Sequence, residues 1–412
     1  MGPGQPPALR LPAQELRRGD LRGDRVSVEG PPRLSLGQIA GYFVRLGTTG
    51  FGGPIALAGY MQRDLVERRH WYTQEEYLQG LAVSQTLPGP LAAQLAMWLG
   101  YVRRGVWGAC AAAVPFILPP FIIVSAVAAL YVAFRGTTII QALFYGIGPA
   151  VIALILRGAW KLVRVTVKDE RRLWAIFAVV GVVTFVARSE VAVLFILAGL
   201  VGVAIYAPRS WLRRAHAAPL VVPMGFGTMW AAVQSMDPNV LLQLGVFFFK
   251  AGAFTFGSGL AIVPFLQQGV VRDFGWLSER EFLDAVAMGM ITPGPVVITA
   301  VFVGYLVAGL AGATVAGLGV FLPPFLMVVL FAPWIIRYRK HPIVIGFTKG
   351  ATAAAAGAIV GAGAVIGTQV IVDLTTVLVF LAALLVLWRT KVPEPLLVGA
   401  AGIIGLVAFA LR

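Results

Sequence analysis

Two glycine-rich segments, each led by a cation, are the part of this chain best suited to binding an anion. Residues 45–54 read RLGTTGFGGP and residues 250–259 read KAGAFTFGSG. Glycines at this density can interrupt a helix and turn backbone N–H groups toward a ligand, and a helix that restarts there directs its positive dipole end at the same place. Hydroxyl groups add further donors. The residues expected to bind are Arg45, Thr48, Thr49, Gly50, Phe51, Gly52 and Gly53 in the first segment, and Lys250, Thr255, Phe256, Gly257, Ser258 and Gly259 in the second.

Each of these features also has a structural explanation. Small residues allow membrane helices to pack closely, and a long cationic side chain can extend to the nearer membrane surface. Arg45 and Lys250 nevertheless occupy equivalent places in the two segments. An ionisable group inside a membrane span is costly enough to indicate function, so we favour a binding role for both cations.

A second pair of motifs places two prolines around a glycine. Residues 85–90 read QTLPGP and residues 290–295 read MITPGP. The prolines remove backbone donors and interrupt the span, and exposed backbone at membrane depth is tolerated only inside protein or beside an aqueous cavity. The residues expected to line such a cavity are Gln85, Thr86, Pro88, Gly89, Pro90, Thr292, Pro293, Gly294 and Pro295, the alternative being a simple kink. A third pair, LPP at 118–120 and 322–324, carries no polar group and is interpreted as a hinge.

Glu76 and Glu281 form a duplicated pair of carboxylates, each just before a predicted span. A carrier coupled to protons needs a carboxylate that can titrate, so both are candidates for proton coupling. The simpler explanation is a charge at a helix N-terminus, stabilised by the helix dipole.

The composition indicates where these motifs lie. The chain has 412 residues, of which 58% are hydrophobic and 12% are charged, and its mean hydropathy is +0.84. A soluble domain carries about 25% charged residues, so this chain could not cover its own surface in water. Apolar runs of spanning length recur along it, which indicates an all-α polytopic membrane protein with broken helices and excludes a β-barrel.

Several other classes are excluded as well. The net charge of +15 is better explained by membrane topology than by nucleic acid, and Cys110, the single cysteine, allows no intrachain disulfide. The sequence has no phosphate-binding loop for ATP, and its three histidines lie outside the predicted spans. We therefore expect no enzymatic activity, no nucleic-acid partner, and no cofactor or metal.

The motifs recur because the chain contains an internal repeat. At an offset of 205 residues Gly52 matches Gly257 and the PGP triplets coincide, and at 204 the LPPF segments coincide. Two homologous halves are a common construction of secondary transporters. The predicted domains are a disordered cytoplasmic arm at 1–33, a first repeat at 34–207, a linker at 208–238 and a second repeat at 239–412.

The distribution of basic residues predicts the topology. The predicted spans are 36–60, 78–101, 105–133, 138–160, 173–187, 190–207, 240–266, 282–307, 311–336, 343–367, 371–388 and 393–411, with a weaker apolar segment at 219–236. Cytoplasmic loops are enriched in Lys and Arg, and this rule is best satisfied when 219–236 also crosses. That gives about 13 spans, inverted halves, a cytoplasmic N-terminus and an external C-terminus. The basic loop at 63–69 fits this topology poorly.

The paired motifs resemble the chromate ion transporter family, in its long form with two repeats. The resemblance covers about residues 36–411 and is carried in each half by the glycine break, a W-x(4)-E segment, PGP and LPP. It implies a carrier of the bacterial or archaeal cytoplasmic membrane that exports chromate and confers chromate resistance, with sulfate as the isosteric competitor. Ser258 replaces Gly53 and Phe254 replaces Thr49, so the two half-sites are not equivalent.

The mechanism expected from these residues is alternating access to a tetrahedral dianion. The anion would be held by Arg45, Lys250 and the backbone amides of the breaks, because an oxyanion that leaves water needs cationic and N–H partners. Coupling to the proton gradient and assembly as a homodimer in the lipid bilayer are further expectations. The alternatives are a carrier of sulfate or another oxyanion, a passive anion channel, and a receptor that does not transport.

Overall fold

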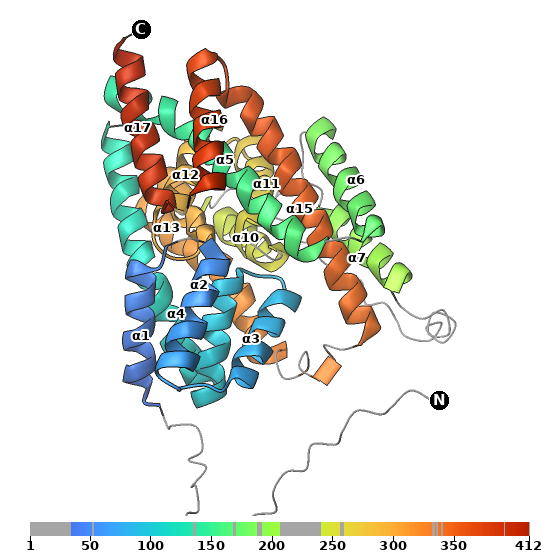
Figure 1. The fold of residues 1–412 in the computed structure, drawn as a ribbon. Helices are drawn as coiled ribbons and strands as arrows, with labels where there is room; N and C mark the ends of the chain where they lie inside the picture. Colours follow the sequence, from blue (N-terminus) through green and yellow to red (C-terminus); the bar gives the residue numbers. More distant parts are fainter. Residues whose placement is uncertain are drawn as a thin grey trace, which may run out of the picture.

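The computed structural model describes residues 34–411 except 52, 135–136, 168–169, 188–191, 207–239, 256–258, 332–333, 335–336, 339–340 and 391. All of the elements within this described part are helical, as Figure 1 shows, which confirms the predicted all-α class. The arm at 1–33 and the weak segment at 219–236 lie outside the described residues. The number of spans therefore stays a prediction.

The described elements of the first half are α1 (Leu36–Thr49), α2 (Gly53–Met61), a π-helical turn η1 (Gln62–Arg68), α3 (Gln74–Thr86), α4 (Leu91–Phe134), α5 (Thr138–Thr166), α6 (Arg171–Ala187) and α7 (Ala192–Tyr206). Those of the second half are α10 (Val240–Phe254), η3 (Gly259–Ala261), α11 (Ile262–Leu266), η4 (Gln267–Asp273), α12 (Glu279–Ile291), η5 (Val296–Ile298), α13 (Thr299–Leu326), η6 (Met327–Phe331), α15 (Pro342–Val370), α16 (Leu374–Arg389) and α17 (Glu394–Ala410). The order of the long helices is the same in both halves.

Four stretches of the described chain are long and apolar enough to cross a membrane: Leu91–Phe134, Thr138–Arg164, Val296–Phe331 and Pro342–Val370. The first contains non-helical backbone at Arg104 and Gly105, and a methyl group on Gly100 would collide with the carbonyl oxygen of Gly108. Residues eight positions apart touch only when the chain reverses, since one straight helix would separate them by about 12 Å. The stretch is therefore a tight pair of antiparallel helices.

The second half repeats this reversal. Gly105 has φ of 57° and Gly309 has φ of 58°, a conformation that favours glycine. Gly304 and Gly312 meet there as Gly100 and Gly108 do in the first half. The two glycines with positive φ lie at equivalent points, where the second and third predicted spans of each half adjoin.

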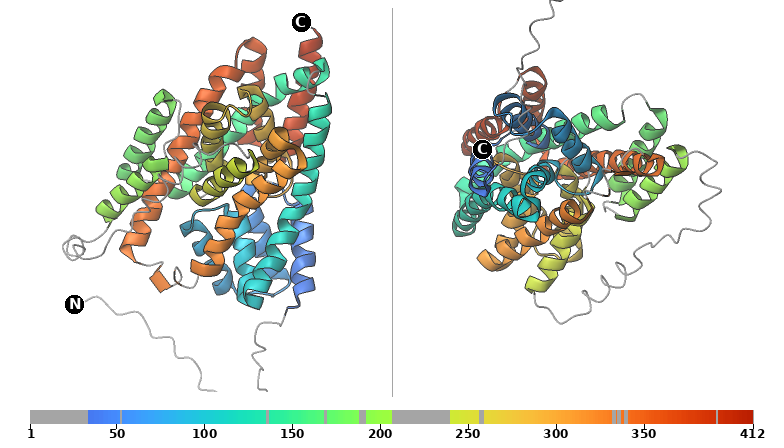
Figure 2. Two further views of the ribbon diagram at one scale, coloured as in Figure 1. Left: turned by 180° about the vertical axis from the view of Figure 1, so that it is seen from behind. Right: turned by 90° about the horizontal axis from the view of Figure 1, so that it is seen from below.

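The two halves are interleaved rather than side by side. The helix α5 packs with α16 and α17 of the other half, whereas α15 packs with α6 and α7, an arrangement visible in Figures 1 and 2. Small residues make these contacts close: a methyl on Gly146 would meet the carbonyl of Ala401, and one on Gly350 would meet that of Ala198. Reciprocal contacts between equivalent positions are characteristic of units related by a two-fold axis.

Candidate functional site

Four helix interruptions meet where the two halves cross. The helix α1 ends at Thr49 and α2 begins at Gly53, while α3 ends at Thr86 and α4 begins at Leu91; the second half is interrupted at the matching places. The Gly294 N–H donates to the carbonyl oxygen of Gly50 at 2.9 Å, and the Gly89 N–H donates to that of Thr255. Gly50 matches Thr255 and Gly89 matches Gly294 in the repeat, so each PGP break is bonded to the glycine break of the opposite half.

The two LPP motifs pack against the PGP breaks. A Cβ on Gly294, whose φ is 100°, would lie 2.9 Å from Pro120 Cγ. One on Gly89, whose φ is 143°, would lie 2.7 Å from Pro324 Cβ. Each PGP glycine is thus covered by the LPP motif of the other half and has no room for a side chain. The structure brings all three repeated motifs together, although they are up to 75 residues apart within each half.

The two cations lie on the helices that lead into the glycine breaks, in unlike surroundings. Arg45 is exposed on α1, and within the described ranges no carboxylate forms an ion pair with it. Lys250 is buried on α10, with 7% of its surface exposed. Each cation precedes its break by little more than one helical turn, which leaves both within side-chain reach of the interruption.

The threonines of the candidate site use their hydroxyl protons within their own helices. Each of the five donates to the carbonyl oxygen four residues earlier: Thr48 to Val44 at 2.6 Å, Thr49 to Arg45 at 2.8 Å, Thr86 to Ala82 at 2.7 Å, Thr255 to Ala251 at 2.6 Å and Thr292 to Met288 at 2.5 Å. Among the described residues of the breaks, the first backbone N–H groups of α2, α4 and η5 lack acceptors inside their own helices and are candidate donors, except at Pro54, which has no N–H.

The other predicted residues are placed as follows. Phe51 and Gln85 are exposed, Gly53 and Pro88 are half-buried, and Gly259, Pro90, Pro293 and Pro295 are buried. Gly52, Phe256, Gly257 and Ser258 lie outside the described residues. The centres of both glycine segments thus stay predictions, while their flanks are described.

The family model for "Chromate transporter" matches the chain twice, over residues 37–203 and 242–406. The chain belongs to the chromate transporter family. It is 50% identical over 391 residues to a chromate transport protein of Cupriavidus metallidurans, covering 93% of this chain and 96% of the relative. It is 47% identical over 379 residues to a probable chromate transport protein of Synechococcus elongatus, covering 91% and 96%. It is 30% identical over 416 residues to a chromate transport protein of Pseudomonas aeruginosa, covering 96% and 98%. No solved structure matches the chain.

In this chromate transporter family member, one buried amide at the breaks was not among the predicted residues. Gln94, in the first turn of α4, is fully buried, and its Nε2 donates to the Pro88 carbonyl at 2.8 Å. Its Oε1 is buried without a hydrogen-bond partner among the described residues. A glutamine beside a PGP break is a polar signal inside an apolar span, but it is not duplicated, since the second half has Thr299 there.

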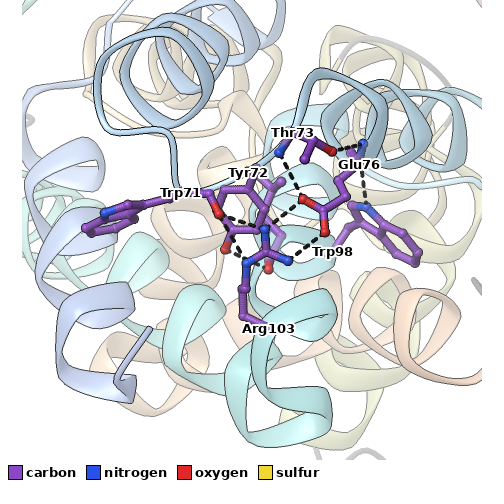
Figure 3. Close-up of polar contacts among 7 residues, drawn as sticks. Trp71, Tyr72, Thr73, Glu76, Trp98 and Arg103 are labelled. Atoms are coloured by element: carbon purple, nitrogen blue, oxygen red, sulfur yellow. Dashed lines mark hydrogen bonds and ion pairs between the residues drawn. The ribbon is translucent and has the colours of Figure 1, made fainter. Parts of the chain in front are cut away.

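Glu76, in the first turn of α3, lies in a cluster of polar contacts with Trp71, Thr73 and Arg103 (Figure 3). The guanidinium of Arg103 donates to Glu76 Oε1 from Nη1 and to Oε2 from Nη2, both at 2.7 Å. Arg103 also donates to the Trp71 carbonyl at 2.7 Å and lies over the Tyr72 ring, 4.3 Å from its centroid. The hydrogen bonds from Arg103 hold the pKa of Glu76 below its usual value, against the opposing effect of burial.

The duplicated carboxylates also cap their helices. Glu76 accepts from the Thr73 N–H at 2.9 Å, and Glu281 accepts from the Ser278 N–H at 3.0 Å, each completing a capping box. These contacts favour the structural explanation of the pair. Proton coupling by Glu76 and Glu281 stays a prediction.

A carboxylate outside the predicted set is more deeply buried. Asp284 lies in α12 with 3% of its surface exposed, and the Tyr131 hydroxyl donates to its Oδ2 at 2.6 Å. An aspartate in an apolar span is itself a signal of function. It is missed by a search for duplicated residues, because the first half has Gln79 at the matching position.

Proposed function

We propose that this protein is a secondary active transporter that exports chromate from the cytoplasm across the inner membrane. The observation that carries the proposal is the exchange of hydrogen bonds between the glycine break of each half and the PGP break of the other. An unbroken membrane helix uses its backbone N–H groups in its own hydrogen bonds. Helices that are interrupted inside an apolar bundle leave some of these groups able to bind a ligand there. The names of the relatives supply the identity of the anion.

In the proposed mechanism the dianion binds between the halves. Arg45 and Lys250 supply charge, and the N–H groups at the starts of α2, α4 and η5 supply hydrogen bonds that replace water. The Gln94 amide and the PGP backbone shape the wall of the site. A relative movement of the two interleaved halves about the proline motifs would expose the site to one side of the membrane and then to the other.

Export fits the charge of the substrate. A membrane potential of 100 mV, negative inside, drives a dianion outward by about 4.6 kcal/mol, at about 2.3 kcal/mol for each charge. Exchange for an entering proton adds another charge moving in the favourable direction. We therefore propose proton-coupled export, which would give the cell resistance to chromate.

The membrane topology belongs to the same proposal. Inverted halves with about 13 spans would place the pseudo-two-fold axis in the membrane plane, so that the breaks meet near its midplane. The N-terminus would be cytoplasmic and the C-terminus external. Reporter fusions at Gly2 and Arg412 test this arrangement, and two ends on the same side of the membrane would reject it.

A carrier of sulfate is the second candidate, because sulfate is also a tetrahedral dianion and the described donors do not select between the two. Uptake of radiolabelled chromate into everted vesicles, with sulfate and molybdate as competitors, decides between them. Chromate uptake that saturates and shows counterflow supports a carrier. Uptake that neither saturates nor shows counterflow indicates a passive channel, and absence of uptake indicates a protein that does not transport chromate.

A further inference from the structure

A tyrosine–aspartate pair joins the two halves away from the helix breaks. The Tyr131 hydroxyl, near the end of α4, donates to Asp284 Oδ2 in α12 at 2.6 Å, and both residues are buried. A separation of 2.5–2.7 Å is typical of an O–H donor to an ionised carboxylate. The two residues are 153 positions apart in sequence, one from each half.

Asp284 borders a cavity of about 470 Å³. The polar and charged residues lining it besides Asp284 are Gln141, Tyr145, Glu279, Arg280 and Gln369, and the rest of the wall is nonpolar. A space of this size with several polar partners can hold many water molecules. Protons can therefore reach the carboxylate through water.

Within the described residues Asp284 forms no ion pair, although Arg280 lines the same cavity. Arg280 lies one turn earlier on the same helix and Glu281 lies beside it, so the nearest charges are of opposite sign. Glu279 is occupied by Gln267 at 3.0 Å and by Arg272 at 3.6 Å, while Tyr145, on α5, donates to Asp373 at 2.6 Å. A buried carboxylate that is not ion-paired is costly when ionised, and binding a proton removes that cost.

The Tyr131–Asp284 pair also lies close to the second PGP break. Asp284 is seven residues before Ile291, the end of α12 at the second PGP break, which is about 10 Å along a helix. The same two segments touch at the break itself, where Pro120 of α4 covers Gly294. A change in the Tyr131–Asp284 contact therefore acts on the two helices that meet at the candidate anion site.

We propose that Asp284 binds and releases the proton that is exchanged for chromate, and that Tyr131 stabilises its ionised form. The inference deepens the proposed function, on which it rests. One proton that enters through the cavity is added to a carboxylate oxygen in one state and released to the opposite side in the other, while the Tyr131 hydroxyl keeps its own proton. With a neutral Asp284, the contact between the halves loses its charge-assisted character and the halves separate more easily.

The test uses the purified full-length protein in liposomes that contain a pH-sensitive dye. Two quantities are measured: uptake of radiolabelled chromate driven by an imposed pH gradient, and exchange of labelled for unlabelled chromate without a gradient. Asp284→Asn keeps the shape of the side chain but cannot titrate. We expect it to lower gradient-driven uptake and chromate-driven proton movement at least about tenfold, with exchange within about threefold of the wild type, because the anion donors remain.

Three further variants complete the test. Asp284→Glu restores a titratable group and is expected to recover proton movement in part. Tyr131→Phe removes only the hydroxyl, which favours the protonated carboxylate, so the pH midpoint of gradient-driven uptake should rise. Asp373→Asn is the matched control: it is another aspartate held by a tyrosine at 2.6 Å, and asparagine caps a helix as well as aspartate does. It should leave both quantities unchanged.

The outcomes separate this inference from the proposed function. Proton movement retained by Asp284→Asn overturns the inference, and so does loss of exchange together with uptake in a variant that elutes as a folded protein. A wild type that exchanges chromate without responding to a pH gradient refutes proton coupling, and with it the inference, but leaves chromate transport standing. A wild type that carries no chromate refutes the proposed function itself.

Discussion

The two halves share a backbone but not its polar chemistry. The helices α3 and α12 have 13 residues each, α5 and α15 have 29 each, and the reversals at Gly105 and Gly309 agree within one degree in φ. The polar side chains differ at matching positions. The first half has Arg103 on Glu76 where the second has Val307, and the second has Asp284 where the first has Gln79.

This difference indicates how the repeat is used. Glycine and proline recur because each break needs the backbone conformations that these residues allow, whereas the proposed proton-binding aspartate is needed only once. The cations follow the same division, since Arg45 is exposed and Lys250 is buried. We infer that the shared backbone forms the anion path and that the single polar groups make the two directions of transport unequal.

The largest effect should come from the exposed cation. We expect Arg45→Ala to abolish chromate transport while the protein still inserts, and to weaken chromate binding by about 50-fold, as loss of a charge-assisted contact of about 2–3 kcal/mol implies. Arg45→Lys should retain part of the activity, because lysine lacks the bidentate fork. Arg68→Ala, an exposed arginine of the same half, is the control. Normal transport by Arg45→Ala would assign this residue to the membrane surface and leave Lys250 as the binding cation.

The PGP glycines should show the next largest effect, and in both halves alike. In Gly294→Ala the new methyl group meets Pro120 and the residue keeps an unfavourable positive φ. We expect a loss of about 2–4 kcal/mol of stability, read as a lower melting temperature in detergent, together with slower transport. Gly105→Ala separates the two causes, because its φ is also positive but its surroundings are open. Equal losses in both variants would show that conformation alone, and not contact between the halves, makes this glycine necessary.

Much of this arrangement can be predicted from the sequence. Doubled motifs predict breaks at 50–53, 87–90 and their counterparts, because glycine and proline act through the local backbone. The repeated motifs do not predict that each glycine break is bonded to the PGP break of the opposite half. Bonding between the two breaks of one half would fit the same motifs equally well. The roles of Gln94, Arg103 and Asp284 could not be predicted for a different reason. None of the three is repeated in the other half, and their hydrogen-bond partners lie 6, 27 and 153 residues away in sequence.

The central glycines test whether backbone amides bind the anion. If they do, Gly52→Ala should weaken chromate affinity about tenfold with an unchanged melting temperature, because a methyl group obstructs approach of the ligand. Gly257→Ala, at the matching position of the second segment, should act in the same direction. The measurements are chromate affinity and melting temperature of the purified protein. Loss of stability with unchanged affinity would favour helix packing as the role of these glycines.

The smallest effect should come from the Arg103–Glu76 pair, and only in the first half. The Arg103 side chain is 8% exposed and that of Glu76 is 24% exposed, so Arg103→Leu should lower the free energy of unfolding by about 2 kcal/mol and the melting temperature by a few degrees.

The stabilisation by this pair should depend on pH. Because Arg103 lowers the pKa of Glu76, the stabilisation is fully present above the pKa of about 4.3 in the unfolded chain and is lost as the pH falls through the lower pKa of the folded protein. The difference in melting temperature between wild type and Arg103→Leu should therefore be constant from about pH 5 to 8 and shrink below about pH 4. Glu75→Gln, an exposed neighbour that accepts from Gln79, is the control for removal of a surface charge. A difference that persists at low pH would mean that Arg103 acts through Trp71 and Tyr72, which would make the two halves more alike than their charges suggest.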